Sequence, residues 1–527
     1  MRQPNRSRRS YTDSVAAPVG GLNDRDATAL MPKSDAIVLE NLFPSTASVD
    51  IRGGCVEHVT GLPITGETLL GYNGVASSKM FAASNGSIYD VSVAGALGAA
   101  IASGFSNNRW ESVNFGGAAG NFLVAVNGQN LPQYYNGTTW TASGVGYATA
   151  ITGATAANFT QVNAWKNRLF FVEKDTLKCW YLPTQAIGGA AASIDFAGVA
   201  KLGGKLVATT TVSSSAGSQI DDYLVAITSE GECLVYQGTD PASAATFNIV
   251  GNYRIGRPIA NGIDNRGSRF LCKLSSQVVA LTADGFVNIQ DAINSDVQAQ
   301  RLTINDKIVN SVSKDVTRYK SNFGWQIVLM PVSNRLFINV PNTQGLASHQ
   351  WVMNTITGAW CKYTGWNATC FLYWQDNLYA IIGQNIYRME IEQSNDFATA
   401  SGTGAPIRAE LESAYQYFGG RGAQKGYKMV RPLFFGSAEV QPSTALNVDF
   451  KSVATLVAPN ATASTNSKWG VAKWGIGKWG AGSTYSQVWR SVNGVGYCAS
   501  LRMSLTCNQM TCSFQAWDII YEKGGLI

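Results

Sequence analysis

Residues 279–285 read Val279-Ala280-Leu281-Thr282-Ala283-Asp284-Gly285, and the chain then returns through Val287 and Ile289. An apolar run that enters a polar turn ending in glycine and comes back as a second apolar run is typical of a β-hairpin. The same unit recurs at residues 80–89 and 225–236, and each copy places Ser or Thr before a turn that ends in glycine. The pattern predicts a fold built from repeated hairpins.

The spacing of these units indicates how they are arranged. Weaker copies end at Gly128 and Gly383, and hairpins without the glycine are predicted at 168–181 and 327–340. Successive turn glycines are 42, 103, 54 and 98 residues apart, so the large spacings are about twice the small ones. A repeat of about 40–50 residues is typical of propeller blades. We therefore expect a β-propeller of six or seven blades, although alternating strands with glycine turns also occur in β-sandwiches.

Composition supports an all-β fold. The 527 residues include 54 Gly, 14 Trp, 21 Tyr and 21 Phe, and only 14% are charged. Short strands and tight turns fit this composition better than charged amphipathic helices do. The hairpin pattern ends after Ile391 in a polar, glycine-containing stretch, and alternating polarity resumes near residue 405. The predicted division is an extended N-terminal arm over 1–54, a propeller over 55–404 and a C-terminal β-sandwich-like domain over 405–527.

The N-terminal arm is basic. Its first ten residues contain no acid, and they hold the arginines Arg2, Arg6, Arg8 and Arg9. No long helix or strand is evident in the arm, so we expect it to lie over another surface. The four arginines are candidates for contact with an adaptor protein, a neighbouring subunit or DNA, and residues 1–17 are expected to be dispensable for folding.

A second candidate interface is a tryptophan repeat. Lys468-Trp469-Gly470 recurs as Lys473-Trp474-Gly475 and as Lys478-Trp479-Gly480, at a period of five that fits neither a strand nor a helix. An extended loop with its rings packed on one surface is one interpretation. The alternative is that the Trp and Lys side chains contact a partner chain or nucleic acid.

The sequence offers little for catalysis, so we expect no enzyme activity. His58 and His349 are the two histidines, neither lies in a nucleophile motif, and surface or turn positions are expected for both. Carboxylates such as Asp221, Asp222, Glu230 and Asp240 are expected to cap hairpins and turns. A propeller glycosidase with carboxylates on separate blades stays open, because it would leave no short motif.

No cofactor or metal ion is expected either. A GxGxxG match at 475–480 lies inside the tryptophan repeat, without the strand and helix that a dinucleotide site needs. The nine cysteines show no CxxC pair, and reduced, mostly buried thiols are expected. Cys507 and Cys512 could belong to a metal site, but the chain has few further ligands. No apolar run approaches the length of a membrane span, so membrane insertion is not expected.

Several segments of the chain form a recognisable series. They are Gly20-Gly21-Leu22-Asn23 with Met31-Pro32, Asp35-Ala36 and Asn41-Leu42-Phe43-Pro44; residues 165–172; residues 235–241; and residues 354–360. In pattern and order they resemble segments of the tail nozzle proteins of short-tailed bacteriophages, also described as tail hub or packaged-DNA stabilisation proteins. The likeness spans most of the chain.

This resemblance implies a structural virion protein of the tail, assembled in the host cytoplasm. It implies a homo-hexameric ring below the portal and adaptor (head-tail connector), with a channel through which double-stranded DNA passes, and attachment of tail fibres or spikes. The alternative is a receptor-binding or glycan-binding, even glycan-degrading, tail protein whose Trp469, Trp474 and Trp479 stack on sugars. An extracellular propeller adhesin is a third, weaker alternative.

Overall fold

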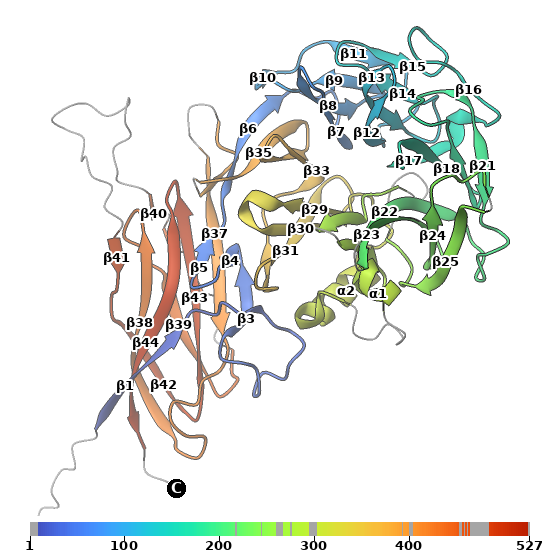
Figure 1. The fold of residues 1–527 in the computed structure, drawn as a ribbon. Helices are drawn as coiled ribbons and strands as arrows, with labels where there is room; N and C mark the ends of the chain where they lie inside the picture. Colours follow the sequence, from blue (N-terminus) through green and yellow to red (C-terminus); the bar gives the residue numbers. More distant parts are fainter. Residues whose placement is uncertain are drawn as a thin grey trace, which may run out of the picture. The chain divides into compact units, whose positions relative to one another are not determined.

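The computed structural model describes residues 9–216, 219–243, 245–259, 267–274, 277–294, 303–392, 394–399, 404–452, 456–457, 459–460, 462–463 and 484–524. The chain forms two compact units (Figure 1). The propeller unit consists of His58–His349 and Trp366–Tyr387. The sandwich unit consists of Met1–Glu57, Gln350–Gly365 and Arg388–Ile527.

The propeller unit is a ring of antiparallel sheets (Figure 1). Four of these sheets have four strands each. The first contains β7 (Thr68–Asn73), β8 (Ser78–Ser84), β9 (Ser87–Asp90) and β11 (Ala100–Ser103), and the second contains β12 (Glu111–Gly117), β13 (Gly120–Val126), β14 (Gln133–Tyr135) and β15 (Trp140–Ala142). The third contains β17 (Phe159–Trp165), β18 (Arg168–Glu173), β19 (Lys178–Tyr181) and β21 (Ala192–Asp195), and the fourth contains β22 (Leu206–Ala216), β23 (Gln219–Thr228), β24 (Glu232–Gly238) and β25 (Phe247–Arg254).

The ring is completed by β26 (Leu271–Leu274), β27 (Gln277–Thr282) and β28 (Gly285–Asn288), and by two hairpins, β29 (Gln326–Met330) with β30 (Arg335–Thr343) and β33 (Ala368–Trp374) with β34 (Asn377–Ile382). The inner strands contact one another in the order β7, β12, β17 and β22, and β22 contacts β27 of the three-stranded sheet. β26 of that sheet contacts β29, β29 contacts β33, and β33 contacts β7. This closed ring confirms the propeller and agrees with the six or seven blades that the sequence predicts.

The predicted hairpins coincide with central strands of the sheets. β8 turns into β9 through Asn85 and Gly86, whose φ angles of 50° and 66° are the left-handed pair that a two-residue hairpin requires. Gly231, with φ of 84°, is the one left-handed residue in the longer turn between β23 and β24, residues 229–231. The apolar side chains of β8, β13, β18, β23 and β27 are buried between sheets. Hairpins whose strands are apolar on both faces are therefore the central strands of blades.

Two helices follow the three-stranded sheet. α1 covers Ile289–Asn294 and α2 covers Val309–Tyr319, with Val312 and Val316 of α2 buried. No helix in the described part of the chain has the length and apolar character needed to cross a membrane.

The sandwich unit contains two sheets. In the first, β44 (Cys512–Lys523) pairs with β38 (Lys425–Gly436) on one side and with β1 (Ser10–Ala16) and β5 (Val49–Ile51) on the other. β5 continues to β4 (Leu42–Pro44), and β38 continues to β41 (Thr484–Ser486) and β42 (Arg490–Gly496). In the second, β37 (Ala405–Ser413) lies between β3 (Asp35–Glu40) and β43 (Ala499–Asn508), and β43 pairs with β39 (Ser443–Val448).

Both sheets of the sandwich unit bury large apolar side chains. Leu411, Leu501 and Met503 come from the second sheet, and Trp517 and Phe514 come from the first. Inward and outward side chains alternate along β38, as a strand with one buried face requires. This confirms the predicted C-terminal β-sandwich.

The structure divides the chain differently from the three consecutive segments that the sequence predicts. Most of the arm is part of the sandwich, because β1, β3, β4 and β5 lie in its two sheets. Residues 350–365 and 388–404 also belong to the sandwich unit. The sequence predicts an extended arm with no long strand that lies over another surface, whereas its short strands are members of the sandwich sheets. They pair with partners hundreds of residues away, which local pattern does not reveal.

Candidate functional site

The axis of the propeller is occupied by the chain itself. Residues 267–270 run from the end of one blade into the next, and we name them the axial segment. The amide of Gly267 donates to the carbonyl of Val207 on β22 at 3.4 Å, and the amide of Ile327 on β29 donates to the carbonyl of Arg269 at 3.0 Å. The segment therefore bonds to inner strands on both sides of its own blade.

The side chains of the axial segment reach farther around the ring. Arg269 Nη2 donates to the Glu67 carbonyl at 2.8 Å and to Thr68 Oγ1 at 2.7 Å, at the start of β7. The hydroxyl of Ser268 donates to the carboxylate of Glu111, the first residue of β12. Because β7 and β12 lie across the ring from β26, these bonds carry the segment across the axis.

The charges at the axis are largely compensated. Arg109 forms an ion pair with Glu67 at 3.2 Å, and the guanidinium groups of Arg109 and Arg269 lie 4.1 and 5.0 Å from the ring centroid of Phe323. Burial raises the pKa of Glu111, against the opposing effects of Arg269 and of the Ser268 hydrogen bonds. This arrangement closes the axis with ion pairs and hydrogen bonds, and it has the character of a structural plug.

Three amide side chains fasten neighbouring inner strands to one another. Gln161 of β17 both donates to and accepts from the backbone of Thr209 on β22, at 3.1 Å each. Gln326 of β29 does the same with Phe371 on β33, at 2.8 and 2.7 Å. Asn114 of β12 donates to Gly71 at 2.8 Å and accepts from Asn73 at 2.9 Å on β7. The inner ring is thus held by directed polar contacts in addition to packing.

The histidines have structural surroundings. His349 is buried, with Nδ1 at 2.7 Å from Asn342 Oδ1 and Nε2 at 2.9 Å from Asp315 Oδ2, so its predicted surface or turn position was wrong. This imidazole joins α2 to the sheet beneath it. His58 is half-buried on β6 (Gly54–Thr60), with Nε2 at 2.9 Å from the carbonyl of Val91.

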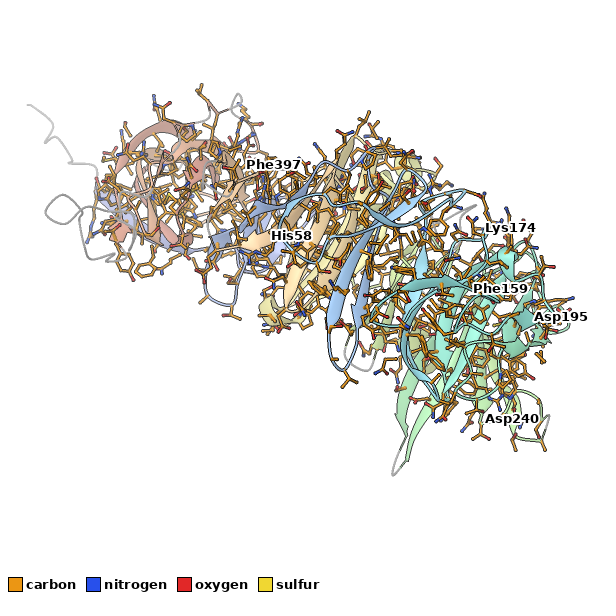
Figure 2. The ribbon with its side chains drawn as sticks, turned by 90° about the horizontal axis from the view of Figure 1, so that it is seen from above. His58, Phe159, Lys174, Asp195, Asp240 and Phe397 are labelled. Atoms are coloured by element: carbon orange, nitrogen blue, oxygen red, sulfur yellow. The ribbon has the colours of Figure 1, made fainter. Side chains whose placement is uncertain are left out.

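The prominent carboxylates serve turns and strands. Glu230 lies in the turn between β23 and β24 and pairs with Arg257 at 2.8 Å. Asp240 begins the loop between β24 and β25, where it accepts from the Ala242 amide at 3.1 Å (Figure 2). Both confirm the turn role predicted for them. Asp221 and Asp222 lie within β23 instead, and Asp222 accepts from the hydroxyl of Ser213 at 2.6 Å.

The cysteines confirm the prediction of reduced, mostly buried thiols. All nine are free, and all but Cys272 are buried. Burial raises the pKa of Cys55 to about 12 and that of Cys272 to about 11. Hydrogen bonding to Cys507 and burial raise the pKa of Cys512. Within the described residues, no group of three or more His, Cys, Asp or Glu side chains is placed to hold a metal ion.

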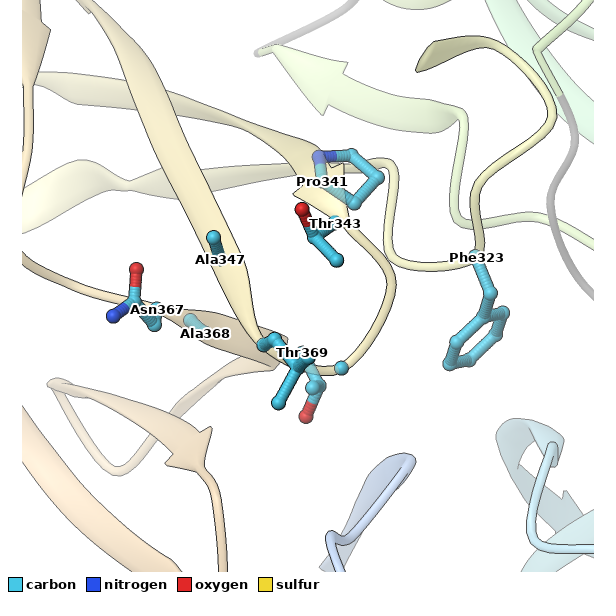
Figure 3. Close-up of a pocket in the computed structure, with 9 residues that line it drawn as sticks. Phe323, Pro341, Thr343, Ala347, Asn367, Ala368 and Thr369 are labelled. Atoms are coloured by element: carbon cyan, nitrogen blue, oxygen red, sulfur yellow. The ribbon is translucent and has the colours of Figure 1, made fainter.

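One small depression lies on the propeller surface (Figure 3). It contains about 170 Å³ of empty space, a volume that includes open solvent. It is lined by Phe323, Pro341, Thr343, Gly345, Leu346, Ala347, Asn367, Ala368 and Thr369. None of these lining residues can act as an acid or a base at neutral pH. Small-molecule sites usually occupy about 300–1,000 Å³ and contain convergent polar groups, so the depression lacks the features of a substrate site.

The two predicted interfaces are only partly described. Arg9 is exposed, and its guanidinium lies 6.0 Å from the ring centroid of Tyr11 on β1. Arg2, Arg6 and Arg8 lie outside the described residues, as do Lys468, Trp469, Lys473, Trp474, Lys478 and Trp479 of the tryptophan repeat.

The fold and its polar contacts define an all-β protein made of a β-propeller and a β-sandwich. No family model and no curated protein sequence matches the chain. Among solved structures, the chain is similar to the propeller domain of Cps50 (Swd1) from Myceliophteria thermophila, at 12% identity and a TM-score of 0.37, over 64% of this chain and 99% of that one.

Two further similar structures extend the comparison. YCF48 from Cyanidioschyzon merolae matches at 11% identity and a TM-score of 0.36, over 63% of this chain and 97% of that one. Raptor from Chaetomium thermophilum matches at 9% identity and a TM-score of 0.40, over 66% of this chain and 29% of that one. At such identities the likeness concerns the fold and carries no information on function.

Proposed function

We propose that the chain is a structural protein of the virion that forms the tail nozzle of a short-tailed bacteriophage. In this role, copies of the chain form a homo-hexameric ring below the portal and adaptor, retain packaged DNA, conduct it during ejection and anchor tail fibres or spikes. The protein acts as a scaffold and catalyses no reaction.

The observation that carries the proposal is that segments resembling the nozzle family contact one another. In the sandwich unit, Asn354 Nδ2 donates to the carbonyl of Pro44 at 2.9 Å, and Gly21 lies directly against the backbone of Trp360. In the propeller unit, Arg168 pairs with Asp240 at 3.3 Å. The segments were chosen for their sequence pattern alone, and they form two contact sites. Such contacts are expected if the chain shares the fold of the nozzle family.

The second support is the plugged axis. Among the described residues, the axial segment crosses the ring through its bonds to Glu67, Thr68 and Glu111. A closed, rigid ring fits a scaffold role. We therefore assign the DNA channel to the space enclosed by several copies of the chain.

The test is the mass and symmetry of the purified protein, alone and with its adaptor. Light scattering gives the number of copies, and negative-stain class averages give the symmetry. A sixfold ring with an axial opening, formed alone or on the adaptor, is the expected result. A monomer or trimer that ignores the adaptor would overturn the proposal and favour the receptor-binding or glycan-binding alternative.

A further inference from the structure

One end of the sandwich unit gathers cations, and we name it the basic end. It consists of the start of β1, the end of β44, and the beginning of β38 with the loop that leads into it. Four of its cations are exposed, namely Arg9, Arg421, Lys428 and Lys523. A fifth, Lys425, is buried.

Aromatic rings bring these cations together. The Lys523 ammonium lies 4.5 Å from the ring centroid of Tyr11, the same ring that Arg9 approaches at 6.0 Å. Tyr11 itself stacks on Tyr521 with 5.8 Å between centroids. Arg421 lies 4.5 Å from the ring centroid of Tyr417. The rings fix the positions of the charges without neutralising them.

Lys425 holds the loop that presents Arg421. Its side chain is fully buried, and Nζ donates to the carbonyls of Gly420 and Ala423 at 2.8 Å and of Tyr497 at 2.9 Å. No carboxylate of the described residues is recorded within ion-pair distance of this ammonium. The carbonyl dipoles that bind this ammonium do not cancel its net charge, and the nearby charge of Asp449 offsets part of it.

Nearby acids offset only part of this charge. Asp13 accepts from the hydroxyl of Tyr521 at 2.9 Å, and Glu522 lies 3.7 Å from Lys428. The charge of Asp449 also acts on Lys425, so the five cations and three acids give the set a net charge of +2.

We propose that the basic end binds the phosphate backbone of double-stranded DNA without regard to base sequence. The choice of DNA as the anion rests on the proposed function. A protein partner would be expected to meet an apolar centre with a polar rim. The basic end instead presents charges whose nearest rings, Tyr11 and Tyr417, already carry a cation. Such a surface suits a regularly charged polyanion, because neutralising its phosphates releases the counterions condensed around it, which favours binding.

The test compares two triple variants that lose the same charge. R9A/R421A/K523A removes three exposed cations of the basic end, and K314A/R318A/K320A removes three exposed cations in or beside α2 of the propeller unit. Binding of a short fluorescent DNA duplex is measured by anisotropy at several salt concentrations. Circular dichroism and the oligomeric state show that each variant is folded.

For the basic-end variant we expect at least about a tenfold weaker Kd, and a salt slope that is reduced by about 2–3, because each phosphate contact contributes about 0.9 to that slope. The α2 variant should bind like wild type. Equal losses in both variants would overturn the proposal, and so would a wild-type protein that prefers a polyglutamate peptide to the duplex. A sixfold ring that fails to bind the duplex would overturn this inference and leave the proposed function intact. A monomer that binds the duplex through the basic end would support this inference and contradict the proposed hexameric ring.

Discussion

Arg52 and Asp396, which are 344 residues apart, form a bidentate ion pair inside the sandwich unit. Nη1 and Nη2 of Arg52 lie 2.8 and 2.6 Å from the two carboxylate oxygens of Asp396, and the side chains are only 1% and 8% exposed. Arg52 Nε also donates to Asn41 Oδ1 at 2.8 Å, and Nη2 donates to the carbonyl of Thr364 at 3.0 Å. This guanidinium therefore joins all three chain segments that make up the sandwich unit.

Removing this guanidinium should destabilise the sandwich unit strongly. Arg52→Ala leaves the carboxylate of Asp396 buried without its partner, and breaking a buried pair in this way costs about 3–5 kcal/mol. Urea unfolding of the sandwich unit measures the loss. The control is Arg408→Ala, because Arg408 pairs with Glu410 at 2.6 Å while 46% exposed, and exposed pairs contribute less than about 1 kcal/mol. Equal losses in the two variants would contradict this assignment.

Gly21 should resist substitution because a backbone lies against it. Its φ is 81°, and a Cβ atom placed there would lie 2.6 Å from the amide nitrogen of Trp360. Gly358 has a similar φ of 69° but open space around it. Gly358→Ala should therefore cost only the left-handed backbone strain of about 1–2 kcal/mol, and Gly21→Ala should cost clearly more. Thermal unfolding of both variants checks this, and an equal loss would show that the contact with Trp360 relaxes freely.

Glu111 should make propeller stability depend on pH. Its folded-state pKa is raised above the ordinary value of 4.5, chiefly by burial, so the folded state favours the neutral carboxyl group. The stabilisation by this group is complete below about pH 4.5 and is lost as the pH rises through the folded-state pKa. Glu111→Gln, which stays neutral, should gain stability relative to wild type over that range. A difference that moves the other way with pH would show that the charge of Arg269 outweighs burial.

Two N-terminal deletions should differ in their effect on stability, because only the longer one removes β1. Removing residues 1–8 leaves β1 intact and should leave stability unchanged. Removing residues 1–16 deletes β1 and exposes one edge of β44, and it also removes Asp13, which accepts from Tyr521. An open edge promotes association between chains. The longer deletion should therefore lower the melting temperature and cause aggregation, as measured by calorimetry and light scattering. Equal behaviour of the two proteins would mean that β1 contributes nothing to the unit.

The repeated hairpins were predictable because their signals are local. A strand of alternating or continuous apolar residues and a turn glycine such as Gly86 or Gly231 are visible within ten residues. The C-terminal β-sandwich-like domain was predictable for the same reason, because alternating polarity resumes near residue 405. β1 was missed because its sequence, Ser10–Ala16, is mostly polar, and it becomes a strand only through pairing with β44.

The polar contacts of the propeller axis could not be predicted from the sequence. Gln161, Gln326 and Glu111 are ordinary polar residues in the sequence, and their importance depends on which strands the ring brings together. The same holds for Arg52 and Asp396. Of the candidate interface residues, Arg9 alone falls in the described part of the chain, where it joins Lys523 at Tyr11, a neighbour that no motif indicates.

The pairing of β1 with β44 determines the order in which the protein can fold during its synthesis. Domains generally fold as units while the chain emerges from the ribosome. The propeller unit is complete once Tyr387 has emerged, whereas β1 and β3, which are made first, find their partners only when β37 and β44 follow. The first strands of the sandwich unit therefore stay unpaired until the whole propeller has been translated. A nascent chain stalled before residue 512 has a complete propeller, but its sandwich lacks β44.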